Sequence, residues 1–160
     1  MRVLGLVALM AGAVFALAGN AGAEEAVQPD APAPGSSPPV IFTLQAEVQG
    51  GKLHIHGDCT VPNGALIIYV AYLPKTPLKR IRGYAMVNHD HYKATVDISK
   101  WPAGKIKIDA NFQVYLQGLK QPDAVIALYG EKGERMTGPH VVQGGASFRA
   151  ATASATVIKP

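Results

Sequence analysis

Three polar side chains alternate with apolar ones early in the chain: His54, His56 and Asp58. On a β-strand they would share one face, with successive members about 6.6 Å apart. Imidazole and carboxylate groups are ligands that zinc and copper take from proteins. A second group, His89-Asp90-His91, could complete the shell. The spacing predicts a candidate zinc or copper site at His54, His56 and Asp58. The alternative is that these side chains simply face solvent on a sheet.

The only cysteine, Cys59, rules out an intrachain disulfide. It has the same parity as Leu53 and Ile55, so we expect a buried thiol that packs as a small apolar group. A nucleophilic cysteine needs a neighbouring base, and His56 points to the opposite face of the strand. The glycine-rich stretches match neither a serine nucleophile elbow nor a phosphate-binding loop. The sequence therefore favours a non-enzymatic protein.

Apolar and polar residues alternate with a period of two through most of the chain, as in strands with one buried face. The runs predict strands at 42–48, 53–59, 82–88, 92–98, 106–116 and 147–158. Turn residues separate many of them, at 50–51, 62–64, 88–90 and 102–104. With a further strand at 65–73, the pattern predicts an all-β fold, an antiparallel β-sandwich of about seven strands.

Two segments depart from this alternation. Residues 65–73 are apolar almost throughout, so both faces of that strand require cover. Residues 122–129 fit a short helix that begins at Pro122 and ends at Gly130, and they fit a strand equally well. As a helix, this segment would cover the outer face of 65–73 through three apolar side chains: Val125, Ile126 and Leu128. Otherwise a partner protein is expected to cover that face.

The first residues have the parts of a secretory signal peptide. Arg2 precedes an apolar run at 3–17, and Ala21-Gly22-Ala23 supplies the small residues of a cleavage site. The run is too short for a transmembrane anchor, the alternative interpretation. Asn20 stands where a lipoprotein would carry its acylated cysteine. We expect a signal peptide at 1–23, a proline-rich tether at 24–39 and a β-sandwich domain at 40–160, in a periplasmic or secreted protein without a stable membrane anchor.

The charge balance disfavours one class of partner. The chain has 15 Lys and Arg against 11 Asp and Glu, a formal net charge of +4. This is far from the dense basic face of a nucleic-acid-binding protein, so we expect no nucleic acid partner. Lys75, Lys79, Arg80 and Arg82 cluster in a segment expected to be a loop. They would meet an anionic partner or keep a sheet edge from pairing with another chain.

Two turns carry a family resemblance. Thr60-Val61-Pro62-Asn63-Gly64-Ala65-Leu66 and Trp101-Pro102-Ala103-Gly104-Lys105-Ile106 resemble turns of bacterial immunoglobulin-like and transthyretin-like modules of exported proteins. In those modules each such turn leads into a central strand. The resemblance spans roughly residues 42–116, and it implies a structural or binding module without catalytic residues. Together these observations predict an exported binding module, whose protein partner meets the 65–73 face or the edge of the 147–158 strand.

Overall fold

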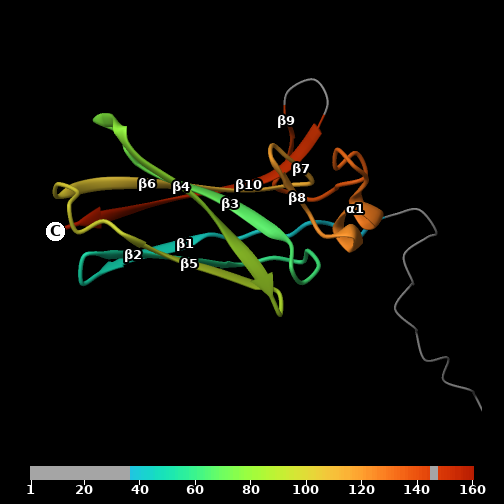
Figure 1. Cartoon of the computed structure of the whole chain (residues 1–160), viewed down its shortest axis with the longest axis horizontal. Helices are drawn as coiled ribbons and strands as arrows, with labels where there is room; N and C mark the ends of the chain where they lie inside the picture. Colours follow the sequence, from blue (N-terminus) through green and yellow to red (C-terminus); the bar gives the residue numbers. More distant parts are fainter. Residues whose placement is uncertain (1–36, 145–147) are drawn as a thin grey trace, which may run out of the picture. The chain divides into compact units, whose positions relative to one another are not determined.

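A computed structural model describes residues 37–144 and 148–160 (Figure 1). The predicted signal peptide at 1–23 and all but the last three residues of the tether at 24–39 lie outside this range. Strands make up most of the described chain, and all their pairings are antiparallel. The predicted all-β antiparallel fold is confirmed. No helix in the described ranges combines the length and hydropathy needed to cross a membrane.

Seven strands of five residues or more correspond to the predicted ones. They are β1 (Gln45–Gln49), β2 (Lys52–Asp58), β3 (Leu66–Leu73), β4 (Thr76–Asn88), β5 (His91–Asp97), β6 (Gly104–Gln113) and β10 (Phe148–Lys159). Three short strands were not predicted: β7 (Tyr115–Leu116), β8 (Leu119–Lys120) and β9 (Val141–Gly144). The strand expected at 106–116 is therefore interrupted after Gln113. The chain turns at Gly118, which has a φ of +79°, so that β7 pairs with β8 instead of extending β6.

Eight strands are hydrogen-bonded in the order β1-β2-β5-β4-β3-β6-β10-β9. The layer of β1, β2 and β5 faces a second layer built on β3, β6 and β10 (Figure 1). Strand β4 links the two layers. It pairs with β3 along most of its length and with β5 only at Val87 and Asn88. On the other side β1 lies close to β10, so the sheet curls around a shared core.

Turn chemistry explains two of the hairpins. Gly50 and Gly51, between β1 and β2, both have positive φ, at +57° and +75°. Between β4 and β5 the same role falls to His89 and Asp90, with φ of +48° and +63°. The side-chain oxygen of Asn63 accepts a hydrogen bond from the His89 N–H at 2.7 Å and supports this tip. Both turns lie where the sequence predicted them.

The prediction of a loop around Lys75–Arg82 is wrong. A two-residue turn at Pro74 and Lys75 is followed at once by β4, so Arg80 and Arg82 lie on a strand. The pairing of β4 with β3 shifts register between Tyr72 and Leu73, which leaves 77–79 as a bulge. The proline-rich spacing indicated a loop, but the bulge lets β4 carry these residues and still pair with β3.

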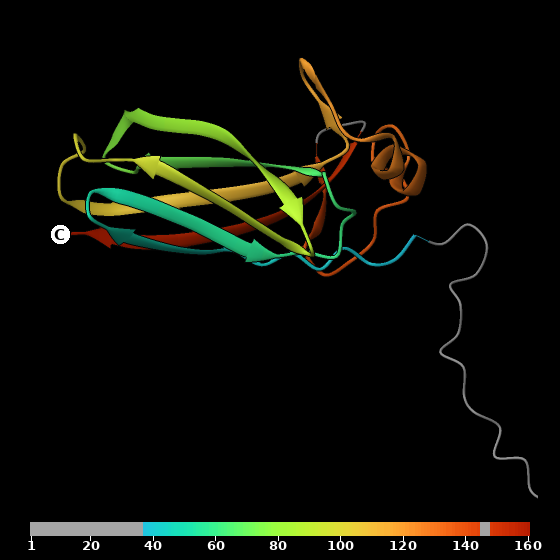
Figure 2. The ribbon, with the colours of Figure 1, turned by 60° about the horizontal axis from the view of Figure 1, so that its bottom comes forward.

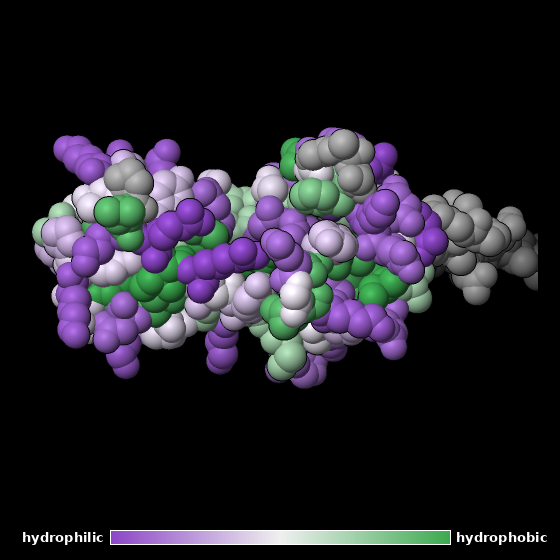
Figure 3. Space-filling model, turned by 45° about the horizontal axis from the view of Figure 1, so that its top comes forward, coloured by the Kyte–Doolittle hydropathy of each residue, from purple (hydrophilic) through white to green (hydrophobic). Residues whose placement is uncertain are grey.

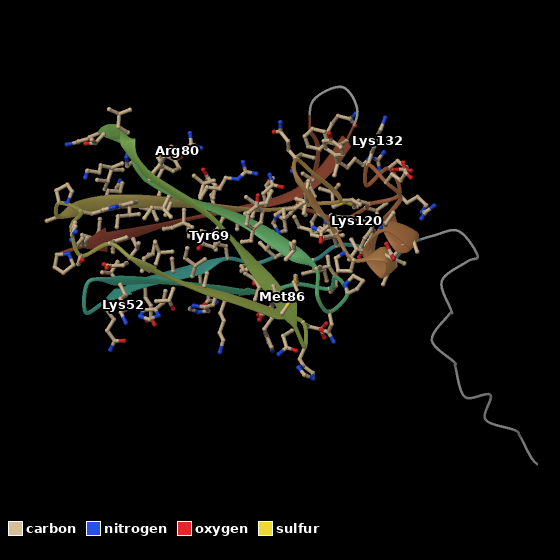
Figure 4. All side chains as sticks on the ribbon, in the orientation of Figure 1. Lys52, Tyr69, Arg80, Met86, Lys120 and Lys132 are labelled. Carbon is tan, nitrogen blue, oxygen red and sulfur yellow. The ribbon has the colours of Figure 1, made fainter. Side chains whose placement is uncertain are left out.

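The core lies between the layers. Tyr92 lies opposite Gly57 in the β2–β5 ladder, and its hydroxyl donates a 2.5 Å hydrogen bond to the Thr43 carbonyl oxygen. Tyr69 covers Gly83 of β4 in the same way. Figure 4 labels Tyr69 between the two layers. Each glycine leaves the space that an aromatic ring from the neighbouring strand fills.

The segment expected as helix or strand is a helix, α1 (Asp123–Tyr129). Its position differs from the predicted one. Val125 and Tyr129 are fully buried in the main core, and the Tyr129 ring packs edge-on against Phe112, with centroids 5.8 Å apart. Phe112 shares the inward parity of the buried residues of β6. The expectation that α1 covers the outer face of 65–73 is therefore wrong, because its apolar side chains pack on the core instead.

Candidate interaction face and histidine cluster

The outer face of β3 stays apolar and is not covered by α1. Ile68 is buried, but it does not belong to the main core, whereas Ile67 and Tyr69 on the other side of the strand do. The ladder with β4 sets a polar or large side chain beside each outward residue of β3. Eight residues make up this surface, which we call the β3–β4 face: Leu66, Ile68, Val70 and Tyr72 opposite Met86, Tyr84, Arg82 and Arg80 respectively.

Exposure is unusually high along the β4 half of this face. The side chain of Met86 is 64% exposed and that of Tyr84 is 40% exposed. The Arg82 guanidinium carbon lies 5.8 Å from the centroid of the Tyr84 ring, within the range of a cation–π contact. Tyr, Met and Arg are the residue types enriched where proteins bind one another. Figure 4 labels Arg80 and Met86 six residues apart along β4.

The far end of the face is basic. Lys107 of β6 pairs across from Tyr72, which in turn pairs with Arg80. Asp109 is the acidic residue beside them, and it joins Val70, Tyr72 and Arg80 in lining a hollow of about 320 Å³. Partial burial and then the negative charge of Asp109 raise the pKa of Tyr72. Figure 3 shows hydrophobic surface broken up by hydrophilic side chains on the side turned towards the viewer.

Sequence reasoning found the apolar β3 strand and missed Tyr84 and Met86. The signal was present, since Arg80, Arg82, Tyr84 and Met86 alternate with smaller or apolar residues. The strand predicted at 82–88 already contained Tyr84 and Met86, but the loop expected around Arg80 and Arg82 kept this alternation from being followed back to Arg80. The aromatic residues Tyr69 and Trp101 are buried in the core and do not contribute to this face.

Asp58 and His91 bring the two predicted metal-binding groups together. The last residues of the β2–β5 ladder place them opposite each other, and Asp58 Oδ1 lies 2.6 Å from His91 Nδ1. Both side chains are more than 60% exposed, so this ion pair contributes little to stability. With His56, Met86 and His89 they line a hollow of about 720 Å³.

The two histidines of the first group, His54 and His56, have different partners. His54 Nδ1 lies 3.2 Å from the Thr95 hydroxyl, and His56 Nε2 lies 3.2 Å from the Gln45 side-chain oxygen. Within residues 37–144 and 148–160, no three His, Cys, Asp or Glu side chains are grouped so as to hold a metal ion. The side chains of His54, His56 and Asp58 thus lie on one face of β2, as predicted, but in this arrangement they do not form a three-ligand metal site.

Cys59 is buried, as the sequence predicted, with a side chain that is 2% exposed. Burial raises the pKa of its thiol from the ordinary 9.0 to about 11, with Asp90 and Asp58 adding to the rise. The β2–β5 ladder continues without a bulge past Gly57, so His56 stays on the opposite face. A thiolate nucleophile is disfavoured by each of these features.

Comparison with protein-family models, with curated proteins and with solved structures found no match for this chain. The β3–β4 face combines exposed apolar, aromatic and basic side chains on adjacent paired strands. The histidine cluster, formed by His56, His89 and His91 with Asp58, is more polar, and the side chains of its Asp58–His91 pair are largely exposed.

Proposed function

We propose that this protein is an exported, non-enzymatic binding module that recognises another protein through the β3–β4 face. One observation carries the proposal. The exposed residues Met86 and Tyr84 pair with Leu66, which is half-buried, and Ile68, which is buried outside the main core, so the exposed apolar surface lies on the β4 side of the face. Exposed apolar patches with a charged rim are typical of protein-binding surfaces.

The charge of the face indicates the chemistry of the partner. Arg80, Arg82 and Lys107 lie towards one end, with Asp109 as the acidic residue among them. An acidic partner segment would gain attraction there and lose it at high salt, because exposed charges are screened. Met86 and Tyr84 at the other end would contact apolar side chains of the same partner.

The non-enzymatic part of the proposal rests on Cys59 and on the histidines. The thiol of Cys59 is buried with a raised pKa, and the nearest histidine on its strand faces away. The pairs made by His54, His56 and His91 involve neighbouring side chains on an exposed sheet surface. Nucleophilic catalysis by a cysteine requires a base within reach of the thiol, and His56 faces away from Cys59.

The export part rests on the pattern of residues 1–23. The resemblance to bacterial immunoglobulin-like and transthyretin-like modules supports the same proposal. The turn at Pro62–Gly64 is followed by β3 and the turn at Pro102–Gly104 by β6, as in those modules. N-terminal sequencing of the protein from its native cell should begin at Glu24, and an intact Met1 would contradict export.

Photo-crosslinking tests the binding surface. A benzoylphenylalanine residue replaces Tyr84 in one variant and Thr95, exposed on the other layer, in a control variant. We expect a discrete adduct from position 84 that weakens when Arg82→Glu is added. Equal adducts from both positions, or an adduct from position 84 that ignores the charge reversal, would contradict the proposal.

A further inference from the structure

One edge of β4 is open. The strand pairs with β3 on one side over most of its length, but on the other side it pairs with β5 only at Val87 and Asn88. Beyond that point β4 and β5 diverge, as Figures 1 and 2 show. Among the residues that the structure places, none forms a strand against residues 76–86 on this side. The backbone N–H and C=O groups directed to that side are free to pair with an added strand.

Only part of this edge suits an added strand. The bulge at 77–79 interrupts the ladder, Lys79 adds a charge, and Pro77 has no N–H to donate. Such features block edge pairing in natural sheets. From Arg80 to Met86 the register with β3 is regular, and seven residues match the usual length of a strand. The usable edge is therefore Arg80–Met86.

The charges of this edge select its occupant. A second copy of β4 paired antiparallel over Arg80–Met86 would place Arg80 opposite Met86 and Arg82 opposite Tyr84, so the arginines of both copies would have no acidic partner across the ladder. An acidic strand would instead gain favourable pairs on the outer face. On the inner face, Ile81 and Ala85 would lie beside the occupant. Both are apolar, and they favour apolar side chains at alternate positions.

We infer that an extended segment of a partner protein, with acidic and apolar residues in alternation, adds as a strand to Arg80–Met86 of β4. This inference rests on the proposed function and specifies how the partner binds. The acidic side chains lie over Arg80 and Arg82, and backbone hydrogen bonds to β4 hold the segment in register. Strand addition of this kind derives its affinity from the main chain and its specificity from alternate side chains.

The test uses two synthetic nine-residue peptides that alternate Glu with Val. One has an ordinary backbone, and the other is N-methylated at alternate residues so that it cannot complete the ladder. Amide hydrogen exchange of the protein is followed by NMR. We expect the ordinary peptide to slow exchange within Arg80–Met86 and the methylated peptide to bind at least about tenfold more weakly, a loss of about 1.4 kcal/mol.

Two variants control for charge. Arg82→Glu should weaken the ordinary peptide at least about fivefold. Lys52→Glu, an exposed residue at the start of β2, should leave binding unchanged. Figure 4 labels Lys52 on the other layer.

The outcomes separate this inference from the proposed function. Equal binding of both peptides, abolished by Arg82→Glu, would overturn strand addition and leave the β3–β4 face as a binding surface. Strand addition would also be overturned if millimolar peptide did not slow amide exchange at Arg80–Met86, or if exchange there were already slow before any peptide was added. In either case the crosslinking result at position 84 decides the proposed function independently.

Discussion

The side chain of Gln121 clamps the backbone of Leu66. Its oxygen accepts a hydrogen bond from the Leu66 N–H at 2.8 Å, and its nitrogen donates to the Leu66 carbonyl oxygen at 2.9 Å and to the Gln113 carbonyl oxygen at 2.9 Å. The β3–β6 ladder ends at the pair of Ile67 and Phe112, one residue short of Leu66 and Gln113. The amide therefore satisfies the backbone groups left over where the two strands separate, and it is 1% exposed.

Replacing this amide should destabilise the fold. Gln121→Leu leaves one buried N–H and two carbonyl groups without their partner, so we expect a loss of at least about 2 kcal/mol in the free energy of unfolding. Urea denaturation measures it. Gln117→Leu, an exposed position in the β7–β8 turn, should change stability by less than about 0.5 kcal/mol. Equal stability of the two variants would show that the clamp contributes nothing.

Removing the hydroxyl group should affect stability differently at two buried tyrosines, Tyr129 and Tyr92. The hydroxyl of Tyr129 has no hydrogen-bond partner among the described residues, whereas that of Tyr92 donates to the Thr43 carbonyl oxygen. Tyr129→Phe should leave stability unchanged or raise it by up to about 1 kcal/mol, and Tyr92→Phe should lower it by about 1 kcal/mol. Thermal and urea unfolding of the pair give the comparison. A clear loss in Tyr129→Phe would reveal a bound water or another partner for that hydroxyl.

Stability should fall in alkali, in part through Cys59. The folded state holds the thiol pKa at about 11 against 9.0 in the unfolded chain, so the neutral thiol is favoured by folding. Below pH 9 this contribution is complete, and it is lost as the pH rises from about 9 through 11. Burial also raises the pKa of Tyr129 to about 12, but that group acts at higher pH.

The measurement is the urea midpoint of the protein and of Cys59→Ala between pH 8 and 10. We expect the midpoint to decline less steeply in the variant, although its absolute stability will be lower through lost packing. Identical slopes would mean that the thiol ionises equally in both states.

The metal hypothesis has a direct test. Because Asp58 pairs with His91, and His54 and His56 bond to Thr95 and Gln45, we expect zinc(II) and copper(II) to bind no more tightly than to free histidine. Isothermal titration calorimetry of the purified protein gives the affinity. Stoichiometric submicromolar binding that disappears in the His54→Ala, His56→Ala double variant would restore the site predicted from the sequence.

Much of the fold could be predicted because strand alternation is a local property. The parity of Leu53, Ile55 and Cys59 placed all three in the core, and each is buried. The turns at Gly50 and Asn88 followed from residue types that accept positive φ or support it. Predictions failed where the pairing of a segment with another strand outweighed the local preferences of its residues. The bulge at 77–79 let β4 begin at Thr76, although the prolines nearby indicated a loop.

The sequence by itself determined which side chains face inward, since each strand carries that information in every second residue. It could not determine which strands are neighbours. The contact between Asp58 and His91, the core position of Tyr129 and the open edge of β4 all depend on how strands distant in sequence pair and diverge. Those choices follow from packing of the whole core, because a strand shows which face it buries but not what it is buried against.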